Sequence, residues 1–159
     1  MEAGRQLVVR TALPLQHFLE NLHDPEQIHG LTSLDSSDCA LTREIGPLKV
    51  LISLNAHTLG HLSLANTHIC AAQPEEMLQL MAPIAAIRSL RSLDVSACDL
   101  LGPRGMKYTV LNELGSALAK WRTVQSLRLS RNRLHAEAAG ILSQWLLELP
   151  QLRSLDISE

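Results

Sequence analysis

A short leucine-rich phrase occurs five times in this chain, and its copies align without gaps. They begin at Leu31, Leu59, Leu90, Val124 and Leu152, and each has a second leucine three residues later. Four copies continue with an apolar residue two positions further on, whereas the first copy has Ser36 there. A phrase repeated at this spacing predicts structural units that stack side by side, because one such unit is too small to bury its own apolar face.

A second feature recurs at one fixed position after each of the first four phrases. Five residues beyond the second leucine stand Cys39, Thr67, Cys98 and Asn132, and an apolar residue follows two positions later. The combined pattern L-x-x-L-x-L-x-x-N/C-x-L resembles the leucine-rich repeat. The resemblance implies that these four residues form a structural turn column, which caps the bend after each strand. Thr67 departs from the usual asparagine or cysteine of the family, but its hydroxyl can donate a comparable hydrogen bond.

The length of the period indicates the kind of repeat. Successive phrases begin 28, 31, 34 and 28 residues apart. Such periods leave room for a helix between strands, whereas periods of about 20 residues do not. The chain is therefore similar to the ribonuclease-inhibitor-like subclass. This resemblance implies an α/β solenoid, an arc of a horseshoe with parallel strands on the concave face and helices on the convex face.

Three stretches between the phrases carry apolar residues at helical spacing. The stripes consist of Met77, Leu80, Met81 and Ile84; of Val110, Leu111, Leu114, Leu118 and Trp121; and of Ala138, Ile141, Leu142, Trp145, Leu146 and Leu149. This spacing predicts amphipathic helices that pack on the strands. Pro83 is predicted to end or kink the first of these helices. A shorter helix of about two turns is predicted through Leu48, Leu51 and Ile52.

The repeats are predicted to occupy residues 31–159. That range holds about five repeats, of which the last is incomplete, so we expect a fragment of a longer array. We also expect further repeats or another chain to cover its C-terminal edge. Residues 1–30 follow a different pattern, since Pro14 precedes apolar residues at helical spacing. These are Leu15, Phe18, Leu19 and Leu22. We interpret this segment as an N-terminal helical cap on the first repeat.

Composition argues against several classes of partner and location. The formal net charge is −2, and Lys and Arg form no run that would attract nucleic acid. No apolar run approaches the roughly 18 residues that a membrane span needs, and the N-terminus lacks the pattern of a signal peptide. Cys39 and Cys98 are predicted to lie two strands apart, too far for a disulfide. We therefore expect a reducing intracellular location, namely the cytoplasm.

No combination of residues predicts catalysis, a cofactor or a metal site. His57 and His61 are four residues apart, but a strand is predicted to begin near His61, so the two would not share a helical face. The chain contains neither a nucleophile elbow nor a phosphate-binding loop. We therefore predict a non-enzymatic protein that needs no metal and no cofactor.

Outward-facing residues of the strands are the first candidates for binding a protein partner. The charged ones are Asp35, Asp94, Arg128 and Asp156, and His61 lies in a neighbouring column. A second group of candidates lies in the loops beyond the strands: His68, Arg131, Arg133 and His135. The strand columns contain no aromatic residue, whereas binding hot spots favour Trp, Tyr and Arg. The sequence leaves open whether the strand face, the loops or repeats beyond residue 159 bind the partner.

These observations favour a protein–protein interaction module, either an adaptor or a scaffold subunit of a larger assembly. Rigid repeat arrays suit this role because they present an extended surface at little ordering cost. Two alternatives stay open. One is a regulator of an enzyme, such as a hydrolase inhibitor or a GTPase activator. The other is the substrate-recruiting domain of a ubiquitin ligase, which a complete F-box before Met1 would favour.

Overall fold

The computed structural model describes residues 5–8, 28–39, 45–67, 74–101 and 108–159. Within them, six strands form one parallel sheet in chain order: β1 (Arg5–Val8), β2 (Leu31–Asp35), β3 (His61–Ser63), β4 (Ser92–Asp94), β5 (Ser126–Arg128) and β6 (Ser154–Asp156). Four α-helices alternate with them: α2 (Ile45–Leu54), α4 (Pro74–Ala85), α5 (Thr109–Leu118) and α6 (Ala139–Glu148), the last preceded by a 3-10 helix at Ala136–Ala138.

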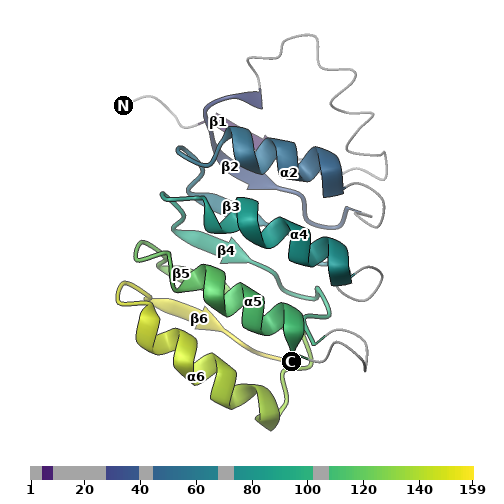
Figure 1. Cartoon of the computed structure of the whole chain (residues 1–159), viewed down its shortest axis with the longest axis vertical. Helices are drawn as coiled ribbons and strands as arrows, with labels where there is room; N and C mark the ends of the chain where they lie inside the picture. The colour runs from purple at the N-terminus through teal and green to yellow at the C-terminus, as the bar shows by residue number, and fades with distance from the viewer. Residues whose placement is uncertain (1–4, 9–27, 40–44, 68–73, 102–107) are drawn as a thin grey trace.

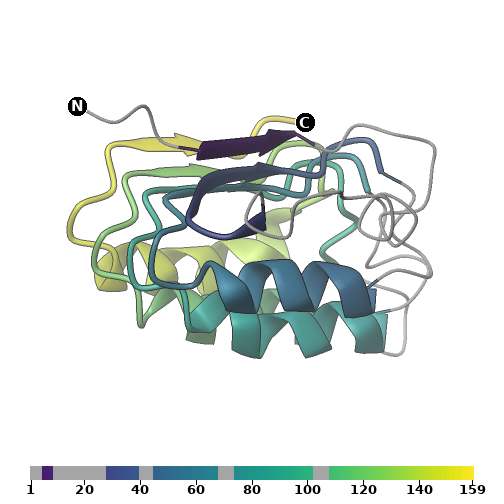
Figure 2. The same ribbon diagram turned by 90° about the horizontal axis from the view of Figure 1, so that it is seen from above.

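The helices form a layer on one side of the sheet, and the strands succeed one another along the stack (Figures 1 and 2). The opposite side of the sheet, called the open face below, carries none of the described helices (Figure 2). Its strand residues include Ser33, His61, Ser92, Ser126 and Ser154, which lie in one register row. The parallel α/β architecture that the repeats predict is thus present.

The register of the sheet places one leucine of every strand in a single row. The row consists of Leu7, Leu34, Leu62, Leu93, Leu127 and Leu155. From the second to the fifth strand these side chains are at most 2% exposed, and burial of each stabilises the fold by about 2 kcal/mol. The gap-free alignment of the five phrases is therefore also the spatial alignment of their strands.

β1 is an element that the repeated phrase did not predict. Leu7 pairs with Leu34 and Val8 pairs with Asp35, so β1 extends the sheet by one strand before the first phrase. The helix predicted after Pro14 lies outside the described residues, as does most of the segment that we interpret as a cap. The described part of that segment contributes a strand to the sheet.

The predicted apolar stripes are buried along the first three helices. Leu48, Leu51 and Ile52 of α2 are fully buried, and the stripes of α4 and α5 are at most 6% exposed. These three helix predictions are confirmed. The stripe of α6 is only partly covered, because Leu146 is 42% exposed. Pro83 lies inside α4, and the helix continues to Ala85, so the proline does not end it.

A row of hydroxyl groups joins the starts of consecutive repeats. Thr58, Ser89 and Thr123 each stand directly before a phrase. Their side chains donate to the backbone carbonyls of Leu31, Leu59 and Leu90, at 2.8, 2.9 and 2.7 Å respectively. Each acceptor is the residue that opens the preceding phrase, so the hydroxyls satisfy carbonyls at the amino ends of the strands.

Replacement of Ser36 by valine should stabilise the protein. The equivalent residues of the next three strands are apolar and fully buried, and Ser36 is buried as well. Its hydroxyl has no hydrogen-bond partner among the described residues. We expect Ser36→Val to raise the free energy of unfolding by about 1–2 kcal/mol, measured by chemical denaturation. Ser126→Val on the open face is the control and should stay within about 0.5 kcal/mol. Equal effects of the two changes would contradict the burial of this hydroxyl.

Replacement by alanine should have opposite effects on stability at Gly115, in the middle of α5, and at Gly140, near the start of α6. A Cβ at Gly115 of α5 would lie 1.8 Å from Nε1 of Trp145, whereas a Cβ at Gly140 of α6 would meet nothing within 4 Å. We expect Gly115→Ala to lower the free energy of unfolding by about 1–3 kcal/mol, because the new methyl group overpacks the contact with Trp145. Gly140→Ala should raise the free energy of unfolding by about 0.5–1 kcal/mol, because alanine has the higher helix propensity. Denaturation curves of both variants test this, and a gain at both positions would argue against the Trp145 contact.

Candidate binding surface

The predicted turn column lies in the bends after β2 to β5, and its four residues are at most 5% exposed. Asn132 makes the largest set of contacts. Its Nδ2 donates to the carbonyls of Val95 and Leu129, both at 2.8 Å. Its Oδ1 accepts the backbone N–H groups of Cys98 at 2.9 Å and Leu100 at 3.2 Å. One side chain thereby links its own strand to the bend of the preceding repeat.

Thr67 and Cys98 donate hydrogen bonds to the same carbonyl group. The Thr67 hydroxyl and the Cys98 thiol donate to the carbonyl of Leu64, at 2.9 and 3.0 Å respectively. Burial raises the pKa of the Cys98 thiol to about 11. The thiol therefore stays protonated and able to donate at neutral pH, and its contacts are those of a structural residue rather than a reactive one.

The residue before each member of the turn column adopts a left-handed backbone. These residues are Asp38, Asn66, Ala97 and Arg131, with φ values of 62°, 58°, 51° and 56°. Their N–H groups donate to carbonyls of the next repeat, those of Ala65, Ser96, Ser130 and Ser158, over 2.8 to 2.9 Å. The backbone hydrogen bonding between neighbouring repeats thus continues past the ends of the strands. Equivalent hydrogen bonds occur at four successive bends.

The acidic residues predicted as binding candidates also shape these turns. Asp35, Asp94 and Asp156 each end a strand, and the Oδ1 atom of each accepts the backbone N–H of the serine two residues later, at 3.0 to 3.1 Å. Such Asx turns are a typical use of aspartate after a strand. The Ser158 backbone N–H, followed by the Ser158 hydroxyl, lowers the pKa of Asp156. The carboxylates are therefore held in place by the backbone.

Four of the predicted binding residues line one depression at the carboxyl ends of the strands. Its volume is about 520 Å³, and it contains Asp94, Arg128, Arg131 and Asp156. Arg128 stands in the register row between the two aspartates. Its Nη1 lies 3.7 Å from Oδ2 of Asp94, and its side chain is 61% exposed. The guanidinium is therefore accessible to a second, external carboxylate.

The other predicted residues do not line this depression. Asp35 and His61 belong to β2 and β3 and do not line it, although the bends after these strands contribute Asp38 and Asn66. Arg133 and His135 are exposed after the bend of β5, and His68 lies outside the described residues. The depression therefore combines three strand candidates with one loop candidate, Arg131.

Polar residues that the sequence analysis did not select also line the depression, namely Asp38, Asn66, Glu159 and three serines. Asp38 and Asn66 occupy the left-handed position of the first two bends, and Asn66 Nδ2 donates to Asp38 Oδ1 at 2.7 Å. Aspartate and asparagine tolerate a positive φ better than most residues. Their recurrence directly before the turn column was the signal that could have identified them.

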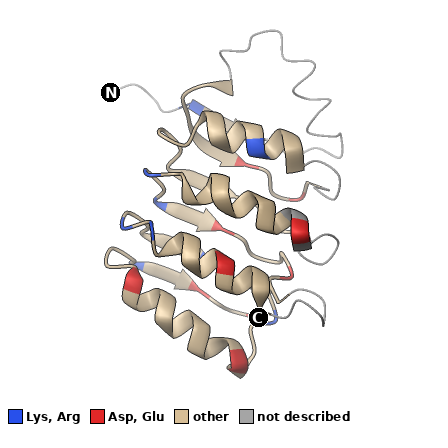
Figure 3. Cartoon of the chain, viewed as in Figure 1, with Lys and Arg blue, Asp and Glu red and all other residues tan. Residues whose placement is uncertain are grey.

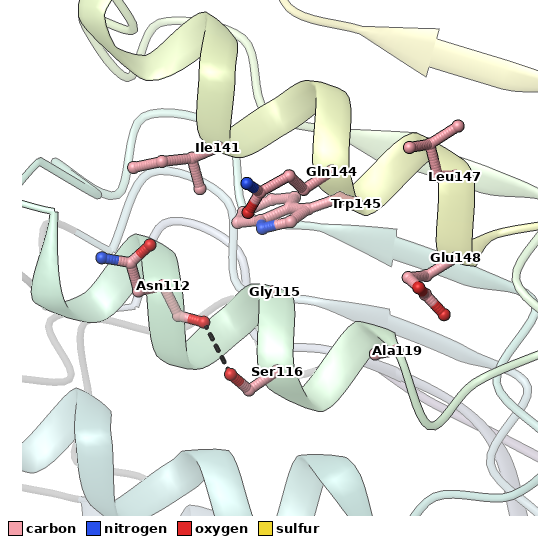
Figure 4. A pocket seen from close by; sticks show the side chains of 9 residues that line it. All are labelled: Asn112, Gly115, Ser116, Ala119, Ile141, Gln144, Trp145, Leu147 and Glu148. Carbon is pink, nitrogen blue, oxygen red and sulfur yellow. Dashed lines mark hydrogen bonds between the residues drawn. The ribbon is translucent and has the colours of Figure 1, made fainter.

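A second depression of about 560 Å³ lies between α5 and α6. Figure 4 shows Trp145 of α6 at Gly115 of α5, with Ile141, Gln144 and Leu147 along the same helix. The hollow lies where α5 and α6 pack together, with the Trp145 indole against Gly115. Its lining carries one charged residue, Glu148, so it offers less for polar recognition than the depression on the open face.

Charged residues of both signs are spread along the stack (Figure 3). Among the described residues, no three His, Cys, Asp or Glu side chains gather in a way that could hold a metal ion. None of the helices in the described part of the chain has the length and apolar character of a membrane span.

The turn role and the ion-pair role of Asp94 can be separated by substitution. We expect Asp94→Ala to cost about 1 kcal/mol of unfolding free energy, because the Ser96 N–H loses its acceptor. Arg128→Ala should cost less than about 0.5 kcal/mol, since an exposed ion pair contributes little. Asp94→Asn keeps an acceptor oxygen and should fall between these values. Urea denaturation measures all three, and an equal cost for Asp94→Ala and Arg128→Ala would show that the ion pair is the main contribution.

Comparison with known proteins supports the fold. No model of a known protein family matches the sequence, and no curated protein is similar enough to count as a relative. The leucine-rich repeat-containing protein LegL7 from Legionella pneumophila is similar in structure, with a TM-score of 0.61 at 21% identity, over 98% of this chain and 45% of that one. The tropomodulin C-terminal domain from Caenorhabditis elegans gives a TM-score of 0.56 at 17% identity, over 91% of this chain and 80% of that one. The chain thus spans less than half the length of LegL7, and it has a leucine-rich-repeat-type fold.

Proposed function

We propose that this chain is a non-catalytic protein–protein interaction module and that its partner binds the depression on the open face. The observation that carries the proposal is that one depression of about 520 Å³ is lined by four predicted binding residues, Asp94, Arg128, Arg131 and Asp156. Three strands and their bends supply these groups, and none of the described helices covers them (Figure 2). A fold of the leucine-rich-repeat type supports protein binding as the general role.

The chemistry of the depression suits a polar partner segment that carries both signs of charge. The Arg128 side chain is 61% exposed, and its guanidinium can donate two parallel hydrogen bonds to a partner carboxylate. Asp94 and Asp156 are already oriented by the backbone N–H groups that they accept. Little side-chain entropy is then lost when a partner binds these carboxylates, which favours affinity.

The proposal includes the finer assignments that the repeats suggest. The periods of 28 to 34 residues favour a ribonuclease-inhibitor-like solenoid curved as a horseshoe arc, with the open face as its concave side. An adaptor or scaffold role follows from a rigid surface of this kind. The buried thiols of Cys39 and Cys98 support a cytoplasmic location, and the net charge of −2 favours a protein over a nucleic acid as partner.

Photo-crosslinking tests both the function and the position of the site. A photoreactive amino acid replaces Arg131, which lines the open-face depression, or Ala119, which lines the hollow between α5 and α6. Each protein is irradiated in extract of the native source. We expect one stoichiometric partner to attach at position 131 and not at position 119, identified by mass spectrometry. Attachment at position 119 alone would assign the binding to the helix layer.

Direct binding of the purified partner then checks the charges. We expect the Arg128→Ala/Arg131→Ala double variant to lose at least about tenfold in affinity, which corresponds to about 1.4 kcal/mol. The matched control is Arg88→Ala/Arg122→Ala, which removes two exposed arginines outside the depression and should bind as the unchanged chain does. Circular dichroism verifies folding of both. Absence of any crosslinked protein partner would overturn the proposed function, and unchanged affinity of the Arg128→Ala/Arg131→Ala variant would overturn the assignment of the site to these charges.

A further inference from the structure

Charges alternate in sign along one register row of the open face. In this row, called the charged row below, Arg128 of β5 stands between Asp94 of β4 and Asp156 of β6. Neighbouring strands lie about 4.8 Å apart, so the backbones of the two aspartates are about 9.6 Å apart, with the arginine midway. A partner that pairs with all three groups must present a positive, a negative and a positive group at this spacing.

Each member of the charged row keeps hydrogen-bonding capacity for a partner. Oδ1 of Asp94 accepts the Ser96 N–H and Oδ1 of Asp156 accepts the Ser158 N–H, which leaves the second oxygen of each carboxylate outside its turn. Nη1 of Arg128 lies 3.7 Å from Oδ2 of Asp94, whereas N–H···O hydrogen bonds extend to about 3.2 Å. The ion pair therefore fixes the order of the charges without satisfying this donor.

The depression around the charged row is polar and carries an excess of negative charge. Apart from two alanines, all of its lining residues are polar or charged. The charged ones are Asp38, Asp94, Asp156, Glu159, Arg128 and Arg131. Four carboxylates thus oppose two guanidinium groups, which leaves two negative charges in excess. Such a surface favours a partner segment in which basic residues outnumber acidic ones, and which binds through charged contacts.

The spacing of the charged row distinguishes between conformations of the partner segment. In an α-helix, residues i+3 and i+7 share a face with residue i and lie about 4.5 and 10.5 Å from it along the axis. In an extended segment, the same-face residues i+2 and i+4 lie about 6.6 and 13.2 Å away. The row requires about 4.8 and 9.6 Å. A helix therefore deviates from it by at most about 0.9 Å, and an extended segment by up to about 3.6 Å.

A polyproline II segment fits only the two ends of the row. Its residues i and i+3 lie about 9.3 Å apart on one face, close to the separation of Asp94 and Asp156. No residue between them points to the same side, because this helix has three residues per turn. Arg128 would then lack a partner carboxylate, so the α-helix is the conformation that serves all three charges.

We infer that the partner segment is a basic α-helix that crosses the strands, with lysine or arginine at positions i and i+7 and an acidic residue at i+3 or i+4. The basic residues pair with Asp94 and Asp156, and the acidic residue pairs with Arg128. None of the described helices covers the open face where this helix would lie (Figure 2). The inference rests on the proposed function and adds to it the conformation and the charge order of the partner.

Two synthetic alanine-rich peptides of the same composition test the charge order. The matched peptide carries Lys at i, Glu at i+3 and Lys at i+7, and in the exchanged peptide the Glu and the first Lys trade places. Circular dichroism verifies that both are helical. We expect the 159-residue chain to bind the matched peptide at least about tenfold more tightly, measured by fluorescence anisotropy at low salt. Equal affinities, or no binding of either peptide, would overturn the inference.

A third peptide tests the conformation. It is the matched peptide with proline between the Glu and the second Lys, which breaks the helix and keeps all three charges. We expect its affinity to fall at least about tenfold relative to the matched peptide. Retained affinity would assign the site to an extended or polyproline II segment and contradict the helix.

Reversal of the central charge on both partners places the peptide on the charged row. In Arg128→Glu, the ratio of affinities should shift at least about tenfold from the matched peptide toward a peptide with Lys at all three positions. Arg122→Glu, which reverses an exposed arginine outside the depression, is the control and should keep the original ratio. If circular dichroism shows Arg128→Glu to be unfolded, Arg128→Gln replaces it and should lose the preference for the matched over the exchanged peptide. An unchanged preference in the folded Arg128 variant would overturn the inference.

The crosslinking experiment separates this inference from the proposed function. A protein partner that attaches at position 131, combined with equal binding of the matched and exchanged peptides, would support the proposed function and reject the basic helix.

Discussion

Stacking of the bends is the interaction on which the rest of the structure depends. A parallel strand of three residues satisfies few backbone groups by itself, and a buried bend without partners for its N–H and carbonyl groups would cost several kcal/mol. Here each bend is completed by its neighbour. The left-handed residue donates to the next repeat, as Arg131 does to Ser158, and Asn132 connects its own strand to the bend at Cys98. No repeat is complete alone.

The same bonds that close the bends also orient carboxylates of the proposed binding surface. Asp94 and Asp156 serve as acceptors for their own turns, so their carboxylates are fixed before any partner arrives. β5 carries arginine at the equivalent position, and Arg128 is left largely exposed between the two aspartates. Asp94 and Asp156 therefore serve both the turns and the proposed binding surface. Substitution of the aspartates must consequently be judged for stability before it is judged for affinity.

Much of the fold was predictable from local pattern, and the misses have local causes. Five phrases predicted the pairing from Leu34 to Leu155, because a periodic apolar position must stay on one side of a sheet. β1 was missed because Gly4 stands where a leucine opens the later phrases. Ser36 was visible as a break in the pattern, but only the structure shows its hydroxyl to be buried without a described partner.

The sequence by itself determined the repeat, its period, the strand register and the buried stripes of the helices, because these follow from the spacing of apolar residues along the chain. Only the tertiary structure decided which charged residues meet. Arg131 joins Asp94 and Asp156 in one depression, whereas Arg133, two residues later, does not line it. The exposure of Leu146 was not predictable either, since Leu118 of α5, 28 residues earlier, has the same side chain and is fully buried. Both outcomes depend on which repeat lies alongside, a relation between residues distant in sequence that local spacing does not encode.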